Sequence, residues 1–237
     1  NQIGSRISVG RTGGAPRVSF DGTNYLLVWG DDANHPDNDV YGQIISKSGD
    51  MIGTPFAITT ASGRQGENDV AYDGTNFLIV WNDNRNDVDK DNQCDTGEGT
   101  CIDVYGQFIT TSGTLVGTEI PISTEVENQR LPAVAFDGTN YLVVWMSRRS
   151  GPELWDVYGR FISKNGIFSV PFMISETPSK RYNPINIAFD GTTYLVVWSK
   201  DIGTGYPDPS SFDIYGRIVS PAGAFAGNEF PINTASG

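Results

Sequence analysis

Residues 131–147 read LPAVAFDGTNYLVVWMS, and residues 156–162, one loop later, read DVYGRFI. The first stretch places two apolar runs on either side of Asp-Gly-Thr-Asn, which is typical of a tight hairpin turn because glycine adopts a positive φ at little cost. The run from Tyr141 to Trp145 is apolar at every position, and at this length that indicates a strand covered on both faces. No amphipathic helix is available as a cover, so sheet must pack on sheet.

The same pattern occurs four times along the chain. The aspartate of the turn stands at positions 21, 73, 137 and 190, so the spacings are 52, 64 and 53 residues. Each copy holds four short strand signals separated by turn residues. Four-stranded units of about 50 to 60 residues that cannot bury both faces alone, repeated around an axis, describe a β-propeller. We therefore predict an all-β protein, a β-propeller of four blades with four antiparallel strands each.

We expect one propeller domain over residues 1–237, with repeats at approximately 11–60, 61–124, 125–176 and 177–237. Residues 1–10 carry an extra strand signal, and the chain also ends in such a strand at 230–233. One terminal strand is thus surplus to four blades. It either closes the ring or augments an edge, where it pairs with another copy or an adjoining domain. The ending TASG repeats residues 60–63, which lead into another blade, as expected for one segment of a longer protein.

Several residue types recur at fixed places in the repeat. We expect the tryptophan that ends each second strand to pack between blades, and the glycine inside each third strand to allow close approach of a neighbour. An aspartate precedes each third strand, where it accepts backbone hydrogen bonds or lies beside a cation. Trp155 falls outside the repeat, in a loop, and is our candidate for ligand contact at the surface. The recurring residues are Trp29, Trp81, Trp145 and Trp198; Gly42, Gly106, Gly159 and Gly216; and Asp39, Asp103, Asp156 and Asp213.

Composition excludes several classes of function. The chain has 16 Lys and Arg against 28 Asp and Glu, a net charge of -12, which repels nucleic acid and anionic lipid. No apolar run approaches the roughly 20 residues needed for membrane insertion. His35 is the single histidine, and only two cysteines are present. A histidine-rich or four-cysteine metal site therefore lacks its ligands, and a Ser-His-Asp triad would depend on His35, which lies in a Pro- and Asp-rich loop.

The second repeat contains a long acidic insertion. Its D-x-D-x-D-N stretch places alternate oxygen ligands as in the opening of a calcium loop, with a glutamate at the twelfth position and Asn92 at the sixth, where such loops have glycine. We predict a calcium site here, formed by Asp83, Asp87, Asp89, Asp91 and Glu98; the alternative is a solvated acidic loop. Cys94 and Cys101 bracket the same segment. A disulfide between them implies an oxidising compartment, and two separate thiols are the alternative.

These motifs resemble a tandem repeat of large secreted and surface proteins of bacteria, often adhesin-like or calcium-dependent. The segments from Phe136 to Trp145 and from Asp156 to Ile162 carry the resemblance best, and it covers nearly the whole chain. The resemblance implies a secreted, extracellular or cell-surface repeat module for binding or scaffolding. In repeat count the chain also resembles four-bladed hemopexin-type propellers, at the level of the fold only.

We therefore expect a non-catalytic extracellular interaction or structural module with a calcium-stabilised loop. Its partner is a protein or glycan on a cell surface, or copies of itself. One alternative is a subunit of an extracellular filament or surface layer that assembles by terminal-strand exchange. Another is a carbohydrate-active enzyme on a propeller scaffold, which would need an acid pair special to one blade. The repeats offer no such pair that stands apart from their common pattern.

Overall fold

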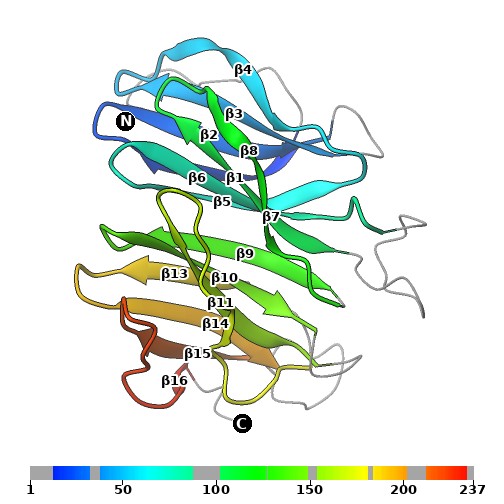
Figure 1. The fold of residues 1–237 in the computed structure, drawn as a ribbon, viewed down its shortest axis with the longest axis vertical. Coiled ribbons are helices and arrows are strands. Elements are labelled where there is room, and N and C mark those ends of the chain that lie inside the picture. The colour runs from blue at the N-terminus through cyan, green and yellow to red at the C-terminus, as the bar shows by residue number, and fades with distance from the viewer. Residues whose placement is uncertain are drawn as a thin grey trace, which may run out of the picture.

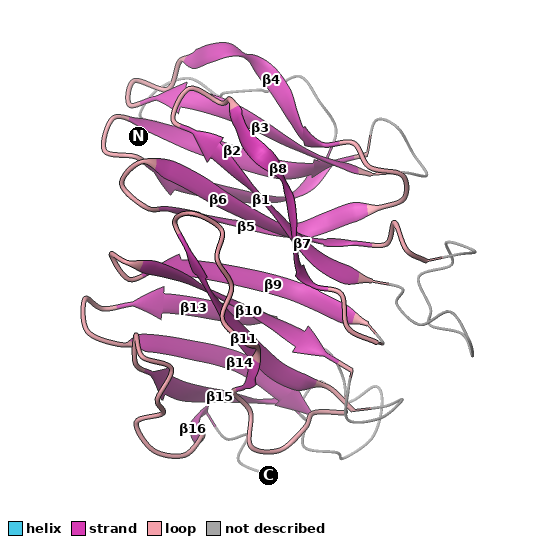
Figure 2. Cartoon of the chain, in the orientation of Figure 1, coloured by secondary structure: helices cyan, strands magenta, loops and turns pink. Residues whose placement is uncertain are grey.

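The computed structural model describes residues 13–32, 38–87, 102–126, 128–148, 154–180, 184–201 and 212–233. Every regular element in these ranges is a strand, as Figure 2 shows. No helix in the described ranges is long and apolar enough to cross a membrane.

The strands form four antiparallel sheets of four strands each, which we call blades 1 to 4 (Figure 1). Blade 1 contains β1 (Gly13–Phe20), β2 (Asn24–Asp31), β3 (Asp39–Ser46) and β4 (Met51–Thr59). Blade 2 contains β5 (Gln65–Tyr72), β6 (Asn76–Asp83), β7 (Asp103–Thr110) and β8 (Leu115–Ser123). Blade 3 contains β9 (Gln129–Phe136), β10 (Asn140–Ser147), β11 (Asp156–Ser163) and β12 (Phe172–Met173). Blade 4 contains β13 (Ile185–Phe189), β14 (Tyr194–Asp201), β15 (Phe212–Val219) and β16 (Phe230–Asn233). The predicted all-β fold of four blades with four antiparallel strands is confirmed.

The Asp-Gly-Thr turns form as the sequence predicts. In the first of them, the Oδ1 atom of Asp21 accepts the backbone N–H groups of Thr23 and Asn24, both at 2.7 Å. Gly22 has a φ of 96°, which a residue with a β-carbon rarely adopts. The other three turns repeat these bonds, so each turn fixes the pairing of the first two strands in its blade.

The hydrophobic core lies between neighbouring blades. Three clusters of buried side chains join blade 1 to blade 2, blade 2 to blade 3, and blade 3 to blade 4. All four recurring tryptophans are at most 4% exposed, which confirms that they pack in the core. Arginines add polar links: Arg160 of β11 donates from its guanidinium to the carbonyl of Ile122 in blade 2 at 2.7 Å, and Arg217 bonds Ile174 of blade 3 in the same way.

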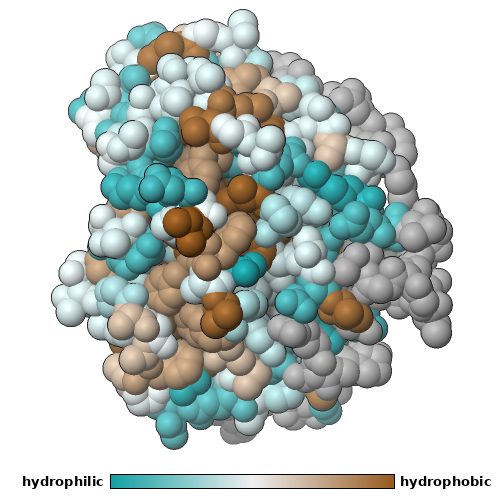
Figure 3. Space-filling view, in the orientation of Figure 1, coloured by the Kyte–Doolittle hydropathy of each residue, from teal (hydrophilic) through white to brown (hydrophobic). Residues whose placement is uncertain are grey.

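The described blades form an open arc rather than a closed ring, and we call this arrangement the open fan. Inner strands pack as β1 on β5, β5 on β9, and β9 on β13. Figure 1 shows blade 1 and blade 4 at opposite ends of the molecule. The ring-closing or augmenting strand predicted at 1–10 lies outside the described residues. The front of the fan presents apolar side chains in a central band, where β8 and β11 lie (Figure 3).

Candidate functional site

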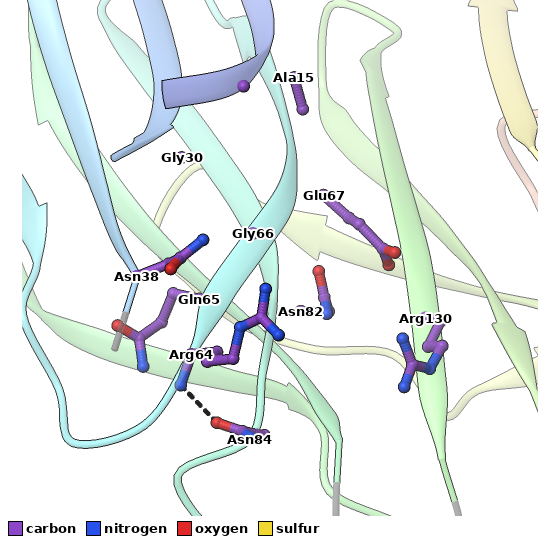
Figure 4. A pocket seen from close by; sticks show the side chains of 11 residues that line it. Ala15, Gly30, Asn38, Arg64, Gln65, Gly66, Glu67, Asn82, Asn84 and Arg130 are labelled. Carbon is purple, nitrogen blue, oxygen red and sulfur yellow. Dashed lines mark hydrogen bonds between the residues drawn. The ribbon is translucent and has the colours of Figure 1, made fainter. Parts of the chain in front are cut away.

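A pocket lies at the end of the fan where the inner strands begin. Its lining comes from the first residues of β1, β5 and β9, from the ends of β2 and β6, and from the residue before β3 (Figure 4). The cavity has a volume of about 380 Å³. We call the residues that line it the polar pocket: Gly14, Ala15, Gly30, Asn38, Arg64, Gln65, Gly66, Glu67, Asn82, Asn84 and Arg130.

Three inner strands reach the pocket through the same backbone irregularity. Ala15, Glu67 and Leu131 have φ values of 51°, 47° and 54°, in the left-handed region that non-glycine residues rarely occupy. The strand register shifts beside each of them. A bulge of this kind redirects nearby side chains, and such strained residues are enriched at binding and catalytic sites. The carboxylate of Glu67 thereby reaches blade 3, where its Oε2 atom accepts the N–H of Leu131 at 3.2 Å.

The pocket combines unpartnered amide oxygens with charged groups. Gln65 is 1% exposed. Its Nε2 donates to the carbonyl of Gly63 at 3.0 Å, while its Oε1 has no hydrogen-bond partner among the described residues. The buried Oδ1 atoms of Asn38 and Asn82 also lack partners within those ranges. Figure 4 shows Arg64, Glu67 and Asn82 extending into one space. The lining of the pocket therefore combines amide and charged side chains, while the three partnerless oxygens themselves are buried.

A buried pair of acids lies in blade 2, at the ends of β6 and β7. Asp83 and Asp103 face each other in the strand register, and both are 0% exposed. Asp83 Oδ2 accepts the indole N–H of Trp81 at 2.9 Å and the guanidinium of Arg85 at 2.5 Å. Asp103 Oδ2 accepts the amide of Asn86 at 2.6 Å. Burial raises the pKa of Asp103 to about 6; the bond from Asn86 opposes this rise, and the charge of Asp83 adds to it. Each acid is thus bonded through its Oδ2 atom, while the buried Oδ1 of Asp103 has no hydrogen-bond partner among the described residues.

The recurring aspartates at the start of the third strands are all buried. Asp39, Asp103, Asp156 and Asp213 are at most 5% exposed. Asp156 Oδ1 accepts the hydroxyl of Ser175 at 3.2 Å, and that hydroxyl in turn accepts the N–H of Val157 at 3.0 Å. These bonds to Asp103 and Asp156 come from side chains, and Ser175 links Asp156 to the backbone of Val157. Hydrogen bonding at the strand start is the role that these contacts support.

The predicted calcium ligands fall only partly within the described residues. Asp83 is held by Trp81 and Arg85, and Asp87 is 2% exposed. The predicted ligands Asp89, Asp91 and Glu98 lie outside the described residues, as do Cys94, Cys101 and His35. Across the described ranges, no three His, Cys, Asp or Glu side chains are grouped to hold a metal ion. The calcium site and the disulfide therefore stay predictions.

Trp155, our candidate for ligand contact at the surface, is buried. Its side chain is 7% exposed and belongs to the cluster between blades 3 and 4. Its backbone N–H donates to the carbonyl of Ser179 at 2.7 Å, and the return bond measures 2.8 Å. An indole buried in this way contributes packing area and leaves little surface for a ligand. The expectation of an exposed Trp155 is wrong because the segment after the loop docks on blade 4.

Sequence reasoning missed the polar pocket. Its charged residues stand at the start of the inner strands, where the four repeats differ: Gly14 and Gly66 match Arg130, and Ala15 matches Glu67. A search restricted to recurring residues passes over such positions. The departure of single copies from the common repeat is the signal that would have located them.

Comparisons with known proteins support the fold. No protein-family model matches the chain, and no curated protein matches it. Among solved structures, the chain is similar to a GH93 α-L-arabinofuranosidase of Fusarium graminearum in complex with arabinobiose. The TM-score is 0.62 at 13% identity, over 92% of this chain and 65% of that one.

Two further structures are similar at the same level. An N-acetylgalactosamine deacetylase from F. plautii, in complex with blood group B trisaccharide, gives a TM-score of 0.58 at 10% identity, over 97% of this chain and 72% of that one. A thermostable family-43 glycoside hydrolase gives 0.56 at 11% identity, over 92% and 72%. The chain spans less than two thirds of the Fusarium enzyme. At these identities the likeness shows the β-propeller fold and no activity.

Proposed function

We propose that this chain is a non-catalytic recognition module that binds a carbohydrate in the polar pocket. One observation carries the proposal: the cavity of about 380 Å³ is lined by the cationic Arg64, the carboxylate of Glu67 and the amide side chains of Asn38, Gln65 and Asn82. Sugar hydroxyls both donate and accept hydrogen bonds, so they suit a site that offers both kinds of group. The volume of the cavity lies within the range of roughly 300 to 1,000 Å³ that is usual for ligand pockets.

The described acids favour binding over turnover. Glycoside hydrolysis generally uses two carboxyl groups that flank the scissile bond. Among the described residues that line the pocket, Glu67 supplies the one carboxylate. The acid pair of blade 2, Asp83 and Asp103, is 0% exposed and already bonded to neighbouring side chains. A recognition role asks for no second carboxylate.

The class of ligand that we propose, a carbohydrate, is supported by the similar structures. Two of them are complexes with sugars, arabinobiose and blood group B trisaccharide, as their names state. The repeat's resemblance to secreted bacterial surface proteins supports an extracellular setting, in which a cell-surface glycan is the partner. The negative charge of -12 argues for a neutral or cationic glycan rather than a polyanion.

A glycan array that includes arabinan oligosaccharides and blood-group trisaccharides tests the proposal, followed by calorimetry on each hit. Arg64→Ala should weaken binding by roughly 10- to 100-fold, because a hydrogen bond from a charged donor contributes about 1.5 to 3 kcal/mol. Lys180→Ala, an exposed cation outside the pocket lining, is the matched control and should bind like the wild type. Sugar release from a bound oligosaccharide would replace the recognition role with an enzymatic one. An array without hits would end the proposal.

A further inference from the structure

Blade 1 has an apolar face that is exposed. In each later blade the equivalent face packs against the blade before it. Val18 is 61% exposed, Phe20 40% and Tyr25 38%. Their equivalents in blade 3 include Val134, which is 5% exposed, and Tyr141, which is 0% exposed, because blade 2 covers them. The first blade thus presents to solvent the face that its sister blades bury.

Blade 4 has the converse open face. Phe230 is 39% exposed and Ile232 51%, and Leu195 and Val197 of β14 are half-buried. In the three earlier blades the residues equivalent to Leu195 and Val197 are all 0% exposed, because the next blade covers them: Leu26, Val28, Leu78, Val80, Leu142 and Val144. The exposed faces of blade 1 and blade 4 are therefore equivalent to the two surfaces that meet wherever neighbouring blades pack together.

The open face of blade 1 already has the geometry of a packed face. Lys47 Nζ lies 4.9 Å from the centre of the Phe20 ring. At the equivalent place in blade 3, Lys164 Nζ lies 4.9 Å from the Phe136 ring, and it donates to the backbone carbonyl of Asp73 in blade 2 at 2.6 Å. Lys47 is thus placed to make the same bond to a preceding blade.

Blade 4 offers the matching acceptors. Asp190 is the equivalent of Asp73 and is exposed, whereas Asp73 is 3% exposed beneath blade 3. The hydroxyl of Tyr194 in blade 4 donates to the carbonyl of Asn140 in β10 at 3.1 Å. Tyr141 in blade 3 bonds Asn76 in β6 in the same way, whereas blade 2 has a phenylalanine at this place. In an end-to-end contact, Tyr25 would meet the carbonyl of Thr193 in this way. Lys47 on one face would thus lie beside Asp190 on the other, with the backbone carbonyl of Asp190 as its acceptor, as Lys164 has the carbonyl of Asp73.

We propose that blade 1 of one copy of this chain packs on blade 4 of a second copy, and that the contact reproduces the blade-to-blade packing seen within the fan. The two faces cannot meet within one molecule as described, because blades 1 and 4 lie at opposite ends (Figure 1). We name a second copy as the occupant because this chain itself carries the matching face, with Asp190 placed to lie opposite Lys47. Such a head-to-tail contact closes into a ring or continues as a filament, depending on the rotation between copies.

Sedimentation of the full chain over a range of concentrations tests the proposal. We expect concentration-dependent association in the wild type. Lys47→Asp and Asp190→Lys each place like charges across the contact and should weaken association by about tenfold or more. Both side chains are exposed, but Asp190→Lys also removes the acceptor of the Thr192 and Thr193 N–H groups in its turn. Circular dichroism and the melting temperature of each variant are therefore measured first, and Lys47→Asp carries the test if Asp190→Lys does not fold. Lys180→Asp, an exposed charge reversal in the segment between β12 and β13 that joins blade 3 to blade 4, is the matched control and should associate as the wild type does.

Mixing supplies the decisive measurement. A Lys47→Asp copy and an Asp190→Lys copy place opposite charges across one of their mutual contacts, so the mixture should form pairs that neither variant forms alone. A wild type that sediments as a monomer at every concentration overturns the proposal. So does association that both charge reversals leave unchanged, since another surface or the terminal residues must then hold the copies together.

Discussion

The glycine inside each third strand shows how tightly single residues are fitted between strands. A β-carbon added to Gly106 would lie 2.8 Å from Cδ1 of Ile122 and 3.1 Å from the backbone oxygen of Ile79. The backbone oxygen cannot rotate away, so the strands themselves must shift. We expect Gly106→Ala to lower the free energy of unfolding by about 1 to 3 kcal/mol, the usual cost of overpacking. Urea unfolding followed by tryptophan fluorescence measures this change.

Gly66→Ala in the same blade is the matched control. A β-carbon at Gly66 would meet no heavy atom within 4 Å, and this glycine does not have a positive φ. We expect its free energy of unfolding to change by less than about 0.5 kcal/mol. Equal losses at Gly66 and Gly106 would contradict the view that close approach, rather than loss of chain flexibility, selects glycine in the third strand.

Asp69 predicts a pH dependence of stability. Its Oδ2 accepts the N–H of Val134 at 2.9 Å across blades 2 and 3. Burial nevertheless raises the pKa of this carboxyl above the ordinary 3.8. The folded protein therefore keeps the proton to a higher pH than the unfolded chain does, so the free energy of unfolding falls as pH rises from about 4. Asp69→Asn keeps an acceptor for Val134 but no charge, and should flatten this fall in urea unfolding at stepped pH. Parallel profiles for wild type and variant would refute the argument.

Recurrence explains which single residues could be predicted from sequence. The four tryptophans sit at one place in the repeat, so one packing environment accounts for all of them, and their burial is confirmed. Trp155 has no counterpart in the other copies, and only the docking of its segment on blade 4 decides that it is buried. The pocket residues Arg64 and Glu67 also break the repeat, so their convergence became visible only in three dimensions.

At the scale of elements, the sequence predicts the strands but does not predict the β-bulges within them. Apolar runs bounded by Asp-Gly turns mark the first two strands of each blade, because turn and strand each impose a local preference. The bulges at Ala15, Glu67 and Leu131 carry no such mark, because these three residues share no side-chain chemistry. They occur where the inner strands of adjacent blades pack together, so tertiary packing selects them.

The acidic loop between β6 and β7 is the element whose role is most directly testable. If Asp83, Asp87, Asp89, Asp91 and Glu98 hold calcium, added Ca²⁺ should raise the melting temperature and a chelator should reverse the rise, because a ligand that binds only the folded state stabilises it. Scanning calorimetry with and without Ca²⁺ measures the shift. The double variant Asp89→Ala with Asp91→Ala should lose it. A wild type that melts at one temperature in both conditions leaves this segment a solvated acidic loop.

The whole molecule adds what no single repeat encodes, the angle between blades. Each repeat encodes a four-stranded sheet with two apolar faces. The number of blades that complete a ring depends on the angle between neighbouring sheets. That angle is set by the core clusters and by hydrogen bonds such as those from Arg160 and Arg217 to the preceding blade. The repeat count therefore predicted four blades correctly and did not foresee that they fan open.

An open fan has two inner and two end blades, and this predicts an uneven distribution of stability. In a chain of repeats each unit is stabilised mainly by its nearest neighbours, so a blade with one neighbour opens at lower free energy than a blade with two. Burial already reflects this order: five or more consecutive residues are buried in β6 and β10, whereas burial is interrupted in β2 and β14. Hydrogen exchange followed by mass spectrometry should therefore show slower exchange in β6 and β10 than in β2 and β14 at low protein concentration. Equal protection of all four strands in dilute solution would mean that the end blades are covered, and the fan would then have to be closed.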